Sequence, residues 1–341
     1  MRALSASRTA PSEALQKRID YHLKLSNQGS TPISLVTLTV CRLALHPPYC
    51  RLPILLKVHM PLRSLLFVPV LRERFVEKAA TSGADAIILD LEDSIAAAEK
   101  APARAAAPEV LQRVAAQHPQ VFIRVNGLDT GLLEQDLHAA VAPGLAGISL
   151  PKANGPETVR QVDAYLTLLE RVRGLPSGYV RLLLWIESAK GVMAVEQSLA
   201  ASPRVLGACF GAEDYTADLG IVRSEGMEEV AWARTRMAVA CHAAGVLALD
   251  TPAAEFRDLA KPRAEAAFAR SIGYRGKHCI HPDQVAVCND VFGLSDAEAA
   301  WANGVVAAYE AGERAGLGAV ALDGAMVDRP VYLRALRLLG R

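Results

Sequence analysis

The chain has 341 residues, of which 51% are hydrophobic, so it can bury the core of one barrel-sized domain or of two ordinary ones. The formal net charge is only +1, and no overall field therefore favours nucleic acid or an acidic partner. The apolar stretch 33–45 is shorter than the roughly 20 residues of a membrane helix. We therefore expect a globular protein that binds neither nucleic acid nor a membrane. Its six cysteines show no C-x-x-C or zinc spacing, which favours a reducing, cytoplasmic compartment.

Residues 1–59 differ in composition from the rest of the chain. They carry eight Lys and Arg residues against only Glu13 and Asp20, and no strand or helix period continues for long. One interpretation is an organelle transit peptide, since such leaders are rich in Arg and poor in acids. The other is an N-terminal extension upstream of a working start at Met60. We favour the extension and expect it to be poorly ordered.

From residue 62 onward, short apolar runs alternate with Ala-rich helical stretches such as 97–117 and 228–244. Runs that are apolar throughout are typical of strands buried on both faces, as in a parallel sheet. The centres of these runs lie about 25 to 35 residues apart, which leaves room for a helix between successive strands. Eight runs occur, at 63–68, 86–91, 121–125, 147–150, 181–186, 205–210, 246–250 and 277–280.

Eight strand–helix units over roughly 230 residues predict an α/β fold of the TIM (β/α)8 barrel type, which we assign to residues 60–294. An open doubly wound sheet is the competing topology, but no G-x-G-x-x-G follows the first strand. After Phe292 the pattern changes to a helix at about 296–315, a Gly-rich turn and the segment 319–339. We expect residues 295–341 to form a separate helical, lid-like appendage.

Charged and polar residues gather directly after the predicted strands. In a barrel these positions converge on the C-terminal rim, which is where enzymes of this fold carry out their chemistry. The residues at these strand ends are Arg72, Glu92, Asp93, Arg124, Asn126, Lys152, Glu187, Asp214, Asp250 and His281.

Glu187 and Asp214 follow the fifth and sixth strands and are the strongest candidates for a metal site. Mg²⁺ binds through one or two carboxylates and completes its shell with water and substrate oxygens. An unpaired carboxylate at the end of a buried strand is costly, so Glu187 needs a positive partner. That partner is either a metal ion or, in the alternative interpretation, Arg124 in a rim salt bridge. The residues alone leave both interpretations open.

The other rim residues have two interpretations each. Arg124 carries a flat guanidinium that suits a planar substrate carboxylate, or it pairs with a neighbouring acid. Lys152 can reach a phosphate or acyl oxygen of a substrate, or it remains solvated. The rest fit structural roles, either on an exposed helix face or as hydrogen-bonding support: Asp93, Lys100, Arg104, Asp250 and His281.

Seven segments, in order over about residues 62–335, resemble the citrate lyase beta subunit-like group of the HpcH/HpaI aldolase superfamily. This group includes malyl-CoA and citramalyl-CoA lyases and related thioesterases. The segments are RSLLFVPVLRERFVEKAATSGADAIILDLEDSIAAAEKAPAR, FIRVNG, SLPKA, WIESAKGV, FGAEDYTADLG, KHCIHPDQV and DGAMVDRP.

The resemblance implies Mg²⁺ held by Glu187 and Asp214, with Arg124 and Glu187 contacting the acyl or 2-oxo acid substrate. It also implies that Arg72 faces the thioester end of the substrate. Residues 70–71 are Val and Leu, where many members of the group carry a small or polar pair. This difference affects the expected substrate fit of the loop and leaves the expected fold unchanged.

Asp328, in the segment GAMVD, matches the lid aspartate of this group. The resemblance implies that it is the catalytic acid/base and that it closes over the barrel of a neighbouring subunit. The protein is then a homo-oligomer, a trimer or hexamer, with exchanged lids.

The implied reaction is Mg²⁺-dependent cleavage or formation of the C–C bond of a 3-hydroxyacyl-CoA. Malyl-, citramalyl- and citryl-CoA are substrates of this type, and the products are an acyl-CoA and a 2-oxo acid. One alternative is a thioesterase that hydrolyses malyl-CoA-type esters. Another is a citrate lyase beta subunit that depends on a carrier protein. The same rim residues serve all three, so the sequence does not separate them.

Overall fold

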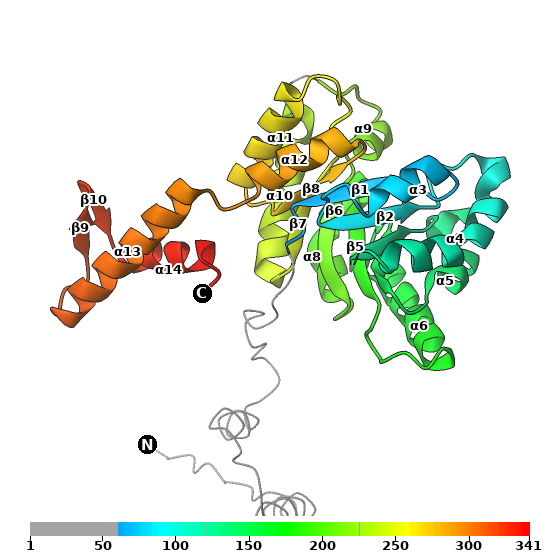
Figure 1. Ribbon diagram of the computed structural model, residues 1–341, viewed down its shortest axis with the longest axis horizontal. Helices are drawn as coiled ribbons and strands as arrows, with labels where there is room; N and C mark the ends of the chain where they lie inside the picture. Colours follow the sequence, from blue (N-terminus) through cyan, green and yellow to red (C-terminus); the bar gives the residue numbers. More distant parts are fainter. Residues whose placement is uncertain (1–60, 119, 225) are drawn as a thin grey trace, which may run out of the picture. The chain divides into compact units, whose positions relative to one another are not determined.

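The computed structural model describes residues 61–118, 120–224 and 226–341, so the expectations for residues 1–59 lie outside the described residues. Eight parallel strands close into a barrel in chain order, and β1 pairs with both β2 and β8 (Figure 1). The predicted TIM barrel is confirmed, and each predicted apolar run forms a strand. The strands are β1 (Ser64–Pro69), β2 (Ala86–Asp90), β3 (Val121–Arg124), β4 (Leu145–Leu150), β5 (Arg181–Ile186), β6 (Val205–Phe210), β7 (Leu247–Asp250) and β8 (Gly276–Cys279).

Helices follow every strand and cover the outside of the barrel (Figure 1). The stretch 97–117 forms a short 3₁₀ turn, η1 (Ala97–Glu99), that continues into α4. A second 3₁₀ turn, η2 (Leu128–Thr130), follows β3. The helices are α3 (Glu73–Ala79), α4 (Lys100–Ala115), α5 (Leu133–Ala140), α6 (Pro156–Val172), α7 (Ala189–Met193), α8 (Val195–Ala200), α9 (Ala212–Leu219), α10 (Glu228–Ala244), α11 (Ala260–Ser271) and α12 (Pro282–Val291).

The strands bury two separate hydrophobic layers because their side chains point alternately into the barrel and out towards the helices. On β1, Leu65 belongs to the inner layer and Leu66 to the outer layer between strands and helices. Leu183 and Leu184 of β5 alternate in the same way. This alternation decides whether a residue at a strand end faces the rim or the helices.

The C-terminal residues form α13 (Asp296–Arg314), a hairpin of β9 (Val320–Leu322) and β10 (Ala325–Val327), and α14 (Arg329–Leu338). Ser295 and Glu298 form a reciprocal capping box at the start of α13. Asp323 and Gly324 both have positive φ and make the two-residue turn that suits a tight hairpin. The predicted helix at about 296–315 is present, whereas the hairpin was not predicted.

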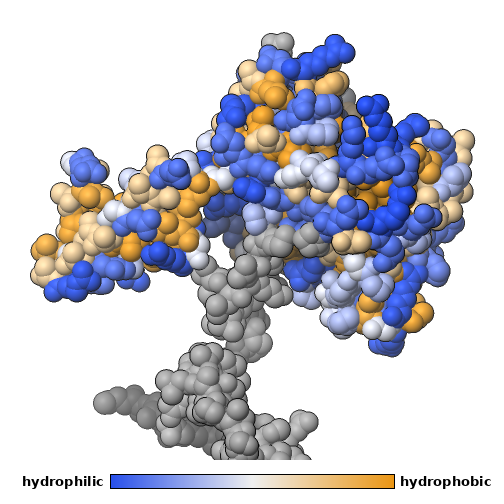
Figure 2. Space-filling view, in the orientation of Figure 1, coloured by the Kyte–Doolittle hydropathy of each residue, from blue (hydrophilic) through white to orange (hydrophobic). Residues whose placement is uncertain are grey.

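The appendage, residues 295–341, has its own small hydrophobic core, which includes Val305, Tyr309 and Ala335. Its surface also carries apolar side chains, as Figure 2 shows. Leu317 and Met326 are more than half exposed there. Throughout residues 61–118, 120–224 and 226–341, no helix has the length and apolar character needed to cross a membrane.

Candidate active site

An aromatic layer closes the barrel interior just below the C-terminal rim. Phe67 stacks on His278 with ring centroids 5.5 Å apart, and the Trp185 ring lies 4.5 Å from that of His278. The Nδ1 of His278 is hydrogen-bonded to the main-chain oxygen of Asp250 at 2.8 Å, while its buried Nε2 has no partner in the described part of the chain. Burial lowers the pKa of His278 to about 4, so the ring is neutral near pH 7. Sequence analysis did not identify this histidine, because it lies inside a strand.

Arg124, the last residue of β3, lies above this floor with its guanidinium carbon 4.5 Å from the centroid of the Phe67 ring. Its Nε and Nη2 each donate to one oxygen of Asp90 at 2.7 Å. Its Nη1 lies 3.0 Å from carboxylate oxygens of both Glu92 and Asp93. Burial alone lowers the pKa of Arg124, but these carboxylates, Asp90 first, raise it above its usual value. The fork of Arg124 is therefore fixed in place by three acids.

Glu187 comes directly after β5 and is only 6% exposed. Its Oε1 accepts the main-chain N–H of Lys152 at 2.6 Å. Among the described residues no cationic nitrogen lies within salt-bridge distance of it, so the alternative pairing with Arg124 is wrong. Burial first, and then the negative charge of Asp214, raises the pKa of Glu187 to about 7. Glu187 is a buried acid without a positive partner.

The rim as a whole carries more negative than positive charge. Asp214 lies in the first turn of α9, where burial and the charge of Asp93 raise its pKa. Burial raises the pKa of Glu92 to about 8, against the opposing effect of Arg124. The acids of the cluster outnumber its two cations, and its members are Asp90, Glu92, Asp93, Glu187, Asp214, Arg124 and Lys152.

This arrangement fits a hard divalent cation. In the described residues no three Asp, Glu, His or Cys side chains converge into a complete ligand cage. Mg²⁺ does not require one, because it binds through one or two carboxylates and retains several waters. A cation between Glu187 and Asp214 would favour their charged forms and offset the burial that raises the pKa of each. The oxygen-only donor set also distinguishes the site from the nitrogen and sulfur ligands typical of zinc.

Lys152 lies at the same rim, two residues beyond β4. Its ammonium is half-buried and pairs with Asp129 at 3.5 Å. Burial lowers its pKa, but the acids around it, Asp129 first, raise it overall. Arg72 immediately precedes α3 and is exposed. Asp328 lies in the appendage, where its Oδ1 accepts the N–H of Val331 at 3.2 Å and caps α14.

Lys100 and Arg104 do not form the ordinary exposed helix face that the sequence suggested. The Nζ of Lys100 donates to the main-chain oxygens of Leu91 and Glu92, at 3.0 and 2.6 Å, and so holds the loop after β2. The Nε of Arg104 donates to the buried carboxylate of Asp136 at 2.6 Å. Lys100 therefore stabilises the loop that carries Glu92 and Asp93, Arg104 pairs with a buried acid of α5, and the interpretation as an exposed helix face is wrong for both.

Asp250 and His281 support the barrel and do not enter the rim cluster. Asp250 follows the inward-facing Leu249, so its carboxylate points out towards the helices, where it pairs with Arg234 and Lys277. His281 accepts the N–H of Asp283 at 3.3 Å and caps α12. Asp90, in contrast, faces the rim, although sequence analysis did not single it out.

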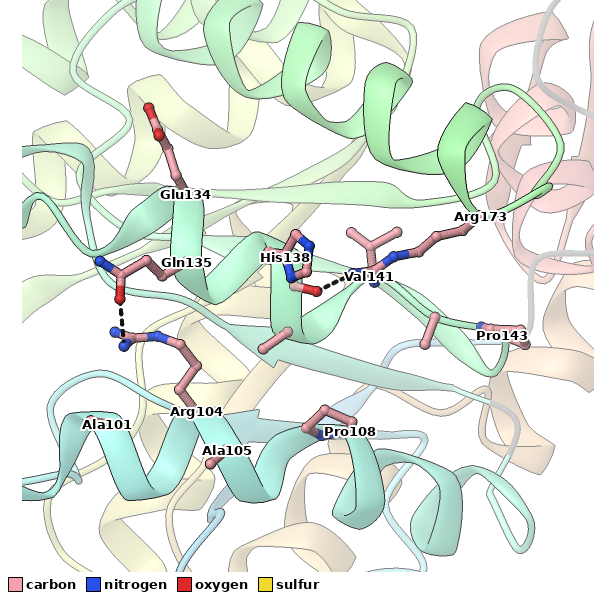
Figure 3. A pocket seen from close by; sticks show the side chains of 12 residues that line it. Ala101, Arg104, Ala105, Pro108, Glu134, Gln135, His138, Val141, Pro143 and Arg173 are labelled. Carbon is pink, nitrogen blue, oxygen red and sulfur yellow. Dashed lines mark hydrogen bonds between the residues drawn. The ribbon is translucent and has the colours of Figure 1, made fainter.

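Two hollows on the barrel surface adjoin each other. The larger, about 1020 Å³, lies between α4, α5 and the end of α6, where Arg104 points to Gln135 and Arg173 to His138 (Figure 3). Most of its lining is Ala, Val and Pro, and it contains none of the candidate metal ligands. The smaller, about 560 Å³, reaches the rim, and its polar lining includes Glu92, Asp93, Lys100, Asn126 and Lys152. Three of the rim residues, Glu92, Asp93 and Lys152, therefore line the smaller hollow, whereas Arg124, Glu187 and Asp214 line neither of the two.

A closed (β/α)8 barrel whose C-terminal rim carries more carboxylates than cations is typical of a metal-dependent enzyme. The profile of the HpcH/HpaI aldolase/citrate lyase family matches residues 63–282. The chain belongs to this family. The resemblance of its motifs and the prediction of a lyase-type enzyme are confirmed at that level.

Individual relatives agree with this assignment. The citrate lyase subunit beta of Leuconostoc mesenteroides subsp. cremoris is 35% identical over 81% of this chain and 92% of its own. An L-malyl-CoA/beta-methylmalyl-CoA lyase of Cereibacter sphaeroides is 36% identical over 79% of this chain and 90% of its own. Among solved structures, the protein CitE of Mycobacterium tuberculosis, in complex with magnesium, acetoacetate and coenzyme A, is 31% identical. It superposes with a TM-score of 0.66 and covers 83% of this chain and 99% of its own.

Proposed function

We propose that the protein is a Mg²⁺-dependent CoA-ester lyase that acts on a 3-hydroxyacyl-CoA such as malyl-, citramalyl- or citryl-CoA. The observation that carries the proposal is the excess of carboxylate at the rim, above all the buried Glu187, which has no positive partner among the described residues. The lyase names of the family members and the magnesium, acetoacetate and coenzyme A of the Mycobacterium tuberculosis relative support it.

Glu187 and Asp214 would hold the metal, which when bound supplies Lewis-acid polarisation to a hydroxyl or carbonyl oxygen of the substrate. Arg124 would neutralise anionic oxygens of the 2-oxo acid with its guanidinium charge. Asp90 holds its Nε and Nη2, so a substrate oxygen would share or take over the Nη1 that faces Glu92 and Asp93. Lys152 lines the rim hollow and would contact an acyl or phosphate oxygen. Arg72 would face the thioester end of the substrate.

In the cleavage direction, the substrate hydroxyl would give its proton to the Asp328 carboxylate, and the bond between the hydroxyl carbon and the α-carbon of the acyl-CoA breaks. The electron pair of that bond passes to the acyl-CoA as an enolate, and the former hydroxyl carbon becomes the carbonyl of the 2-oxo acid. Asp328 would then return a proton to the α-carbon, protected from water once the appendage covers the site.

We propose that the appendage of one subunit covers the barrel of another in a homo-oligomer, a trimer or hexamer. Asp328 belongs to the appendage, whose surface carries apolar side chains (Figure 2). Leu317, Met326 and Leu333 of the appendage are exposed. Apolar side chains gathered on a surface favour burial against a partner. A second subunit would thereby supply the acid/base group.

Product analysis tests the reaction. Purified protein with malyl-CoA and Mg²⁺ should release glyoxylate together with acetyl-CoA, and EDTA should stop the release. Malate with free CoA would instead identify a thioesterase. Turnover that begins only after a carrier protein is added would identify a carrier-dependent beta subunit. Full metal-dependent activity in both Glu187→Gln and Asp214→Asn would exclude the proposed metal site.

Mixed oligomers test the exchange of lids. Glu187→Gln and Asp328→Asn should each be inactive alone, because each lacks one half of the site. Co-expression of the two should restore part of the activity, since some sites combine an intact barrel with an intact lid. No recovery in mixed oligomers, shown by mass spectrometry to contain both chains, would contradict the exchange.

A further inference from the structure

Two backbone features surround the side chain of Glu187, and both are unusual for their positions. The first is Lys152, whose φ of 48° places a non-glycine residue in the left-handed region. In this conformation its N–H donates to the Oε1 of Glu187 at 2.6 Å. Strained backbone of this kind concentrates at functional sites.

The ammonium of Lys152 is engaged elsewhere, 3.5 Å from the carboxylate of Asp129. The contact between Lys152 and Glu187 therefore belongs to the main chain. A residue chosen only for its side chain would not need the left-handed conformation, whereas a main-chain donor aimed at Glu187 depends on the local direction of the backbone.

The second feature is Gly211, directly after β6. A Cβ on this residue would lie 2.5 Å from both the Cβ and the Oε2 of Glu187, closer than real atoms approach. Its φ of −104° is one that any residue adopts. Glycine is therefore required here for space, and the space that it leaves is filled by the Glu187 carboxylate.

Gly211 also connects the two candidate metal ligands. It immediately precedes α9, and Asp214 lies three residues further on, in the first turn. Its N–H donates to the main-chain oxygen of Ile186, the residue before Glu187, at 3.2 Å. The position of one carboxylate is thus tied through Gly211 to the segment that carries the other.

We propose that the N–H of Lys152 and the bare Cα of Gly211 form a cradle that fixes the Glu187 carboxylate in the orientation that shares a divalent cation with Asp214. The proposal rests on the proposed function, since it assumes that these two acids are the metal ligands. Lys152 and Gly211 act through Glu187, so they are positioning residues. Such residues change metal affinity about 10-fold to 100-fold when they are replaced.

The test is calorimetric titration of metal-free full-length protein with Mg²⁺, together with a chemical denaturation curve for each variant. Gly211→Ala should weaken Mg²⁺ binding about 10-fold to 100-fold. Gly207→Ala is the matched control, because Gly207 lies in β6, the strand that leads to Gly211, and its Cβ would meet the main-chain oxygen of Leu247 in β7 at 2.7 Å and no atom of Glu187. It should lower stability and leave Mg²⁺ affinity unchanged. Equal losses of affinity in the two variants would overturn the cradle.

Two further variants separate the parts of the proposal. Lys152→Gly keeps the main-chain donor and removes the ammonium, so it should retain Mg²⁺ affinity; a loss as large as that of Gly211→Ala would assign the role to the ammonium. Glu187→Asp keeps the charge but withdraws the carboxylate from the cradle, so it should lose Mg²⁺ affinity even if Gly211→Ala fails to fold. Retained affinity in Glu187→Asp would show that the cradle is not needed.

Asp214→Asn distinguishes this proposal from the function on which it rests. If Asp214→Asn binds Mg²⁺ as the wild type does, the metal site itself is wrong. If Asp214→Asn loses Mg²⁺ while Gly211→Ala retains it, the metal site stands and only the cradle fails.

Discussion

Two clusters of charged side chains lie on either side of the barrel wall, and they differ in the balance of acids and cations. Outside the wall, between β7, β8 and the helices, two cations face two carboxylates: Arg234, Lys277, Asp250 and Glu265. Inside the rim, acids outnumber cations, and Glu187 has no positive partner among the described residues. The outer cluster completes its own ion pairs, whereas the rim cluster requires a further cation.

The difference teaches how to tell a structural charge cluster from a functional one in this protein. Burial acts on both clusters, yet the pKa of Asp250 is lowered by Lys277 and Arg234, while those of Glu92 and Glu187 are raised. A lowered pKa marks an acid whose partner is already present in the fold. The raised pKa of Glu187 marks an acid for which the described residues supply no positive partner, whereas at Glu92 burial and the neighbouring acids outweigh the pairing with Arg124.

The largest effect should come from unbalancing the outer cluster. Asp250→Asn leaves Arg234 and Lys277 buried with too little negative charge, and the unfolding free energy should fall by about 3–5 kcal/mol. Urea denaturation measures this. As a control, Asp290→Asn breaks the exposed pair with Arg263 and should change stability by less than about 1 kcal/mol. Similar losses of stability in the two variants would contradict the idea that the outer cluster depends on its buried ion pairs.

Removing a negative charge from the rim should instead raise the stability of the protein. At pH 8 in EDTA, Glu187→Gln should raise the unfolding free energy by about 1–3 kcal/mol, because the neutral side chain avoids burying an unpaired charge. Glu170→Gln is the matched control, since Glu170 is a buried glutamate held by Arg204 and by the N–H groups of Gly178 and Val180. It should lose stability. A loss of stability in both variants would mean that positive groups of the fold already balance the charge of Glu187.

The pH dependence should follow the raised acids. The pKa values of Glu92 and Glu187 rise from 4.5 to about 8 and 7, so the folded protein binds more protons than the unfolded chain between these limits. Their contribution to stability is therefore full below pH 4.5 and is lost as the pH rises towards 8. Denaturation curves at pH 5 to 8 in EDTA should show this decline, and saturating Mg²⁺ should reduce it. A flat profile in EDTA would refute the assignment.

The smallest change in stability should come from Asp328, which is neither buried nor part of either cluster. Asp328→Ala removes the cap of α14 and should cost about 1 kcal/mol, whereas Asp328→Asn keeps a capping oxygen and should cost little. Turnover of malyl-CoA should fall about 100-fold or more in both, since neither can transfer a proton. Wild-type turnover in Asp328→Asn would leave Asp328 as a helix cap only.

The barrel was predictable because buried parallel strands leave long apolar runs in the sequence. Each of the eight predicted runs coincides with a strand, from β1 (Ser64–Pro69) to β8 (Gly276–Cys279), and its ends differ from those of the strand by at most two residues. The hairpin of β9 and β10 was not predictable in the same way, since its strands have only three residues each and show no measurable period. The sequence DG at 323–324 was the available signal.

The site was predictable only in part, because apolar runs do not reveal which face of a strand points inwards. Asp90 and Asp250 both end a strand, yet Asp90 lies two residues after the inward-facing Ile88 and Asp250 one residue after the inward-facing Leu249. The first therefore joins the rim and the second the helix layer. His278 was missed because it lies inside a strand and not at its end. The roles proposed for the candidate site residues stay predictions: Arg72, Arg124, Lys152, Glu187, Asp214 and Asp328.

Closure of the barrel has a consequence for how the chain folds. Residues 64–66 of β1 pair with residues 277–279 of β8, more than 200 positions later in sequence. Pairing at such separation is slow to form. During synthesis, β1 keeps an unpaired edge until β8 has left the ribosome, and open edges of this kind are prone to aggregate. We therefore expect chains that end before residue 276 to be poorly soluble and to depend on chaperones, even though they contain every acid of the rim.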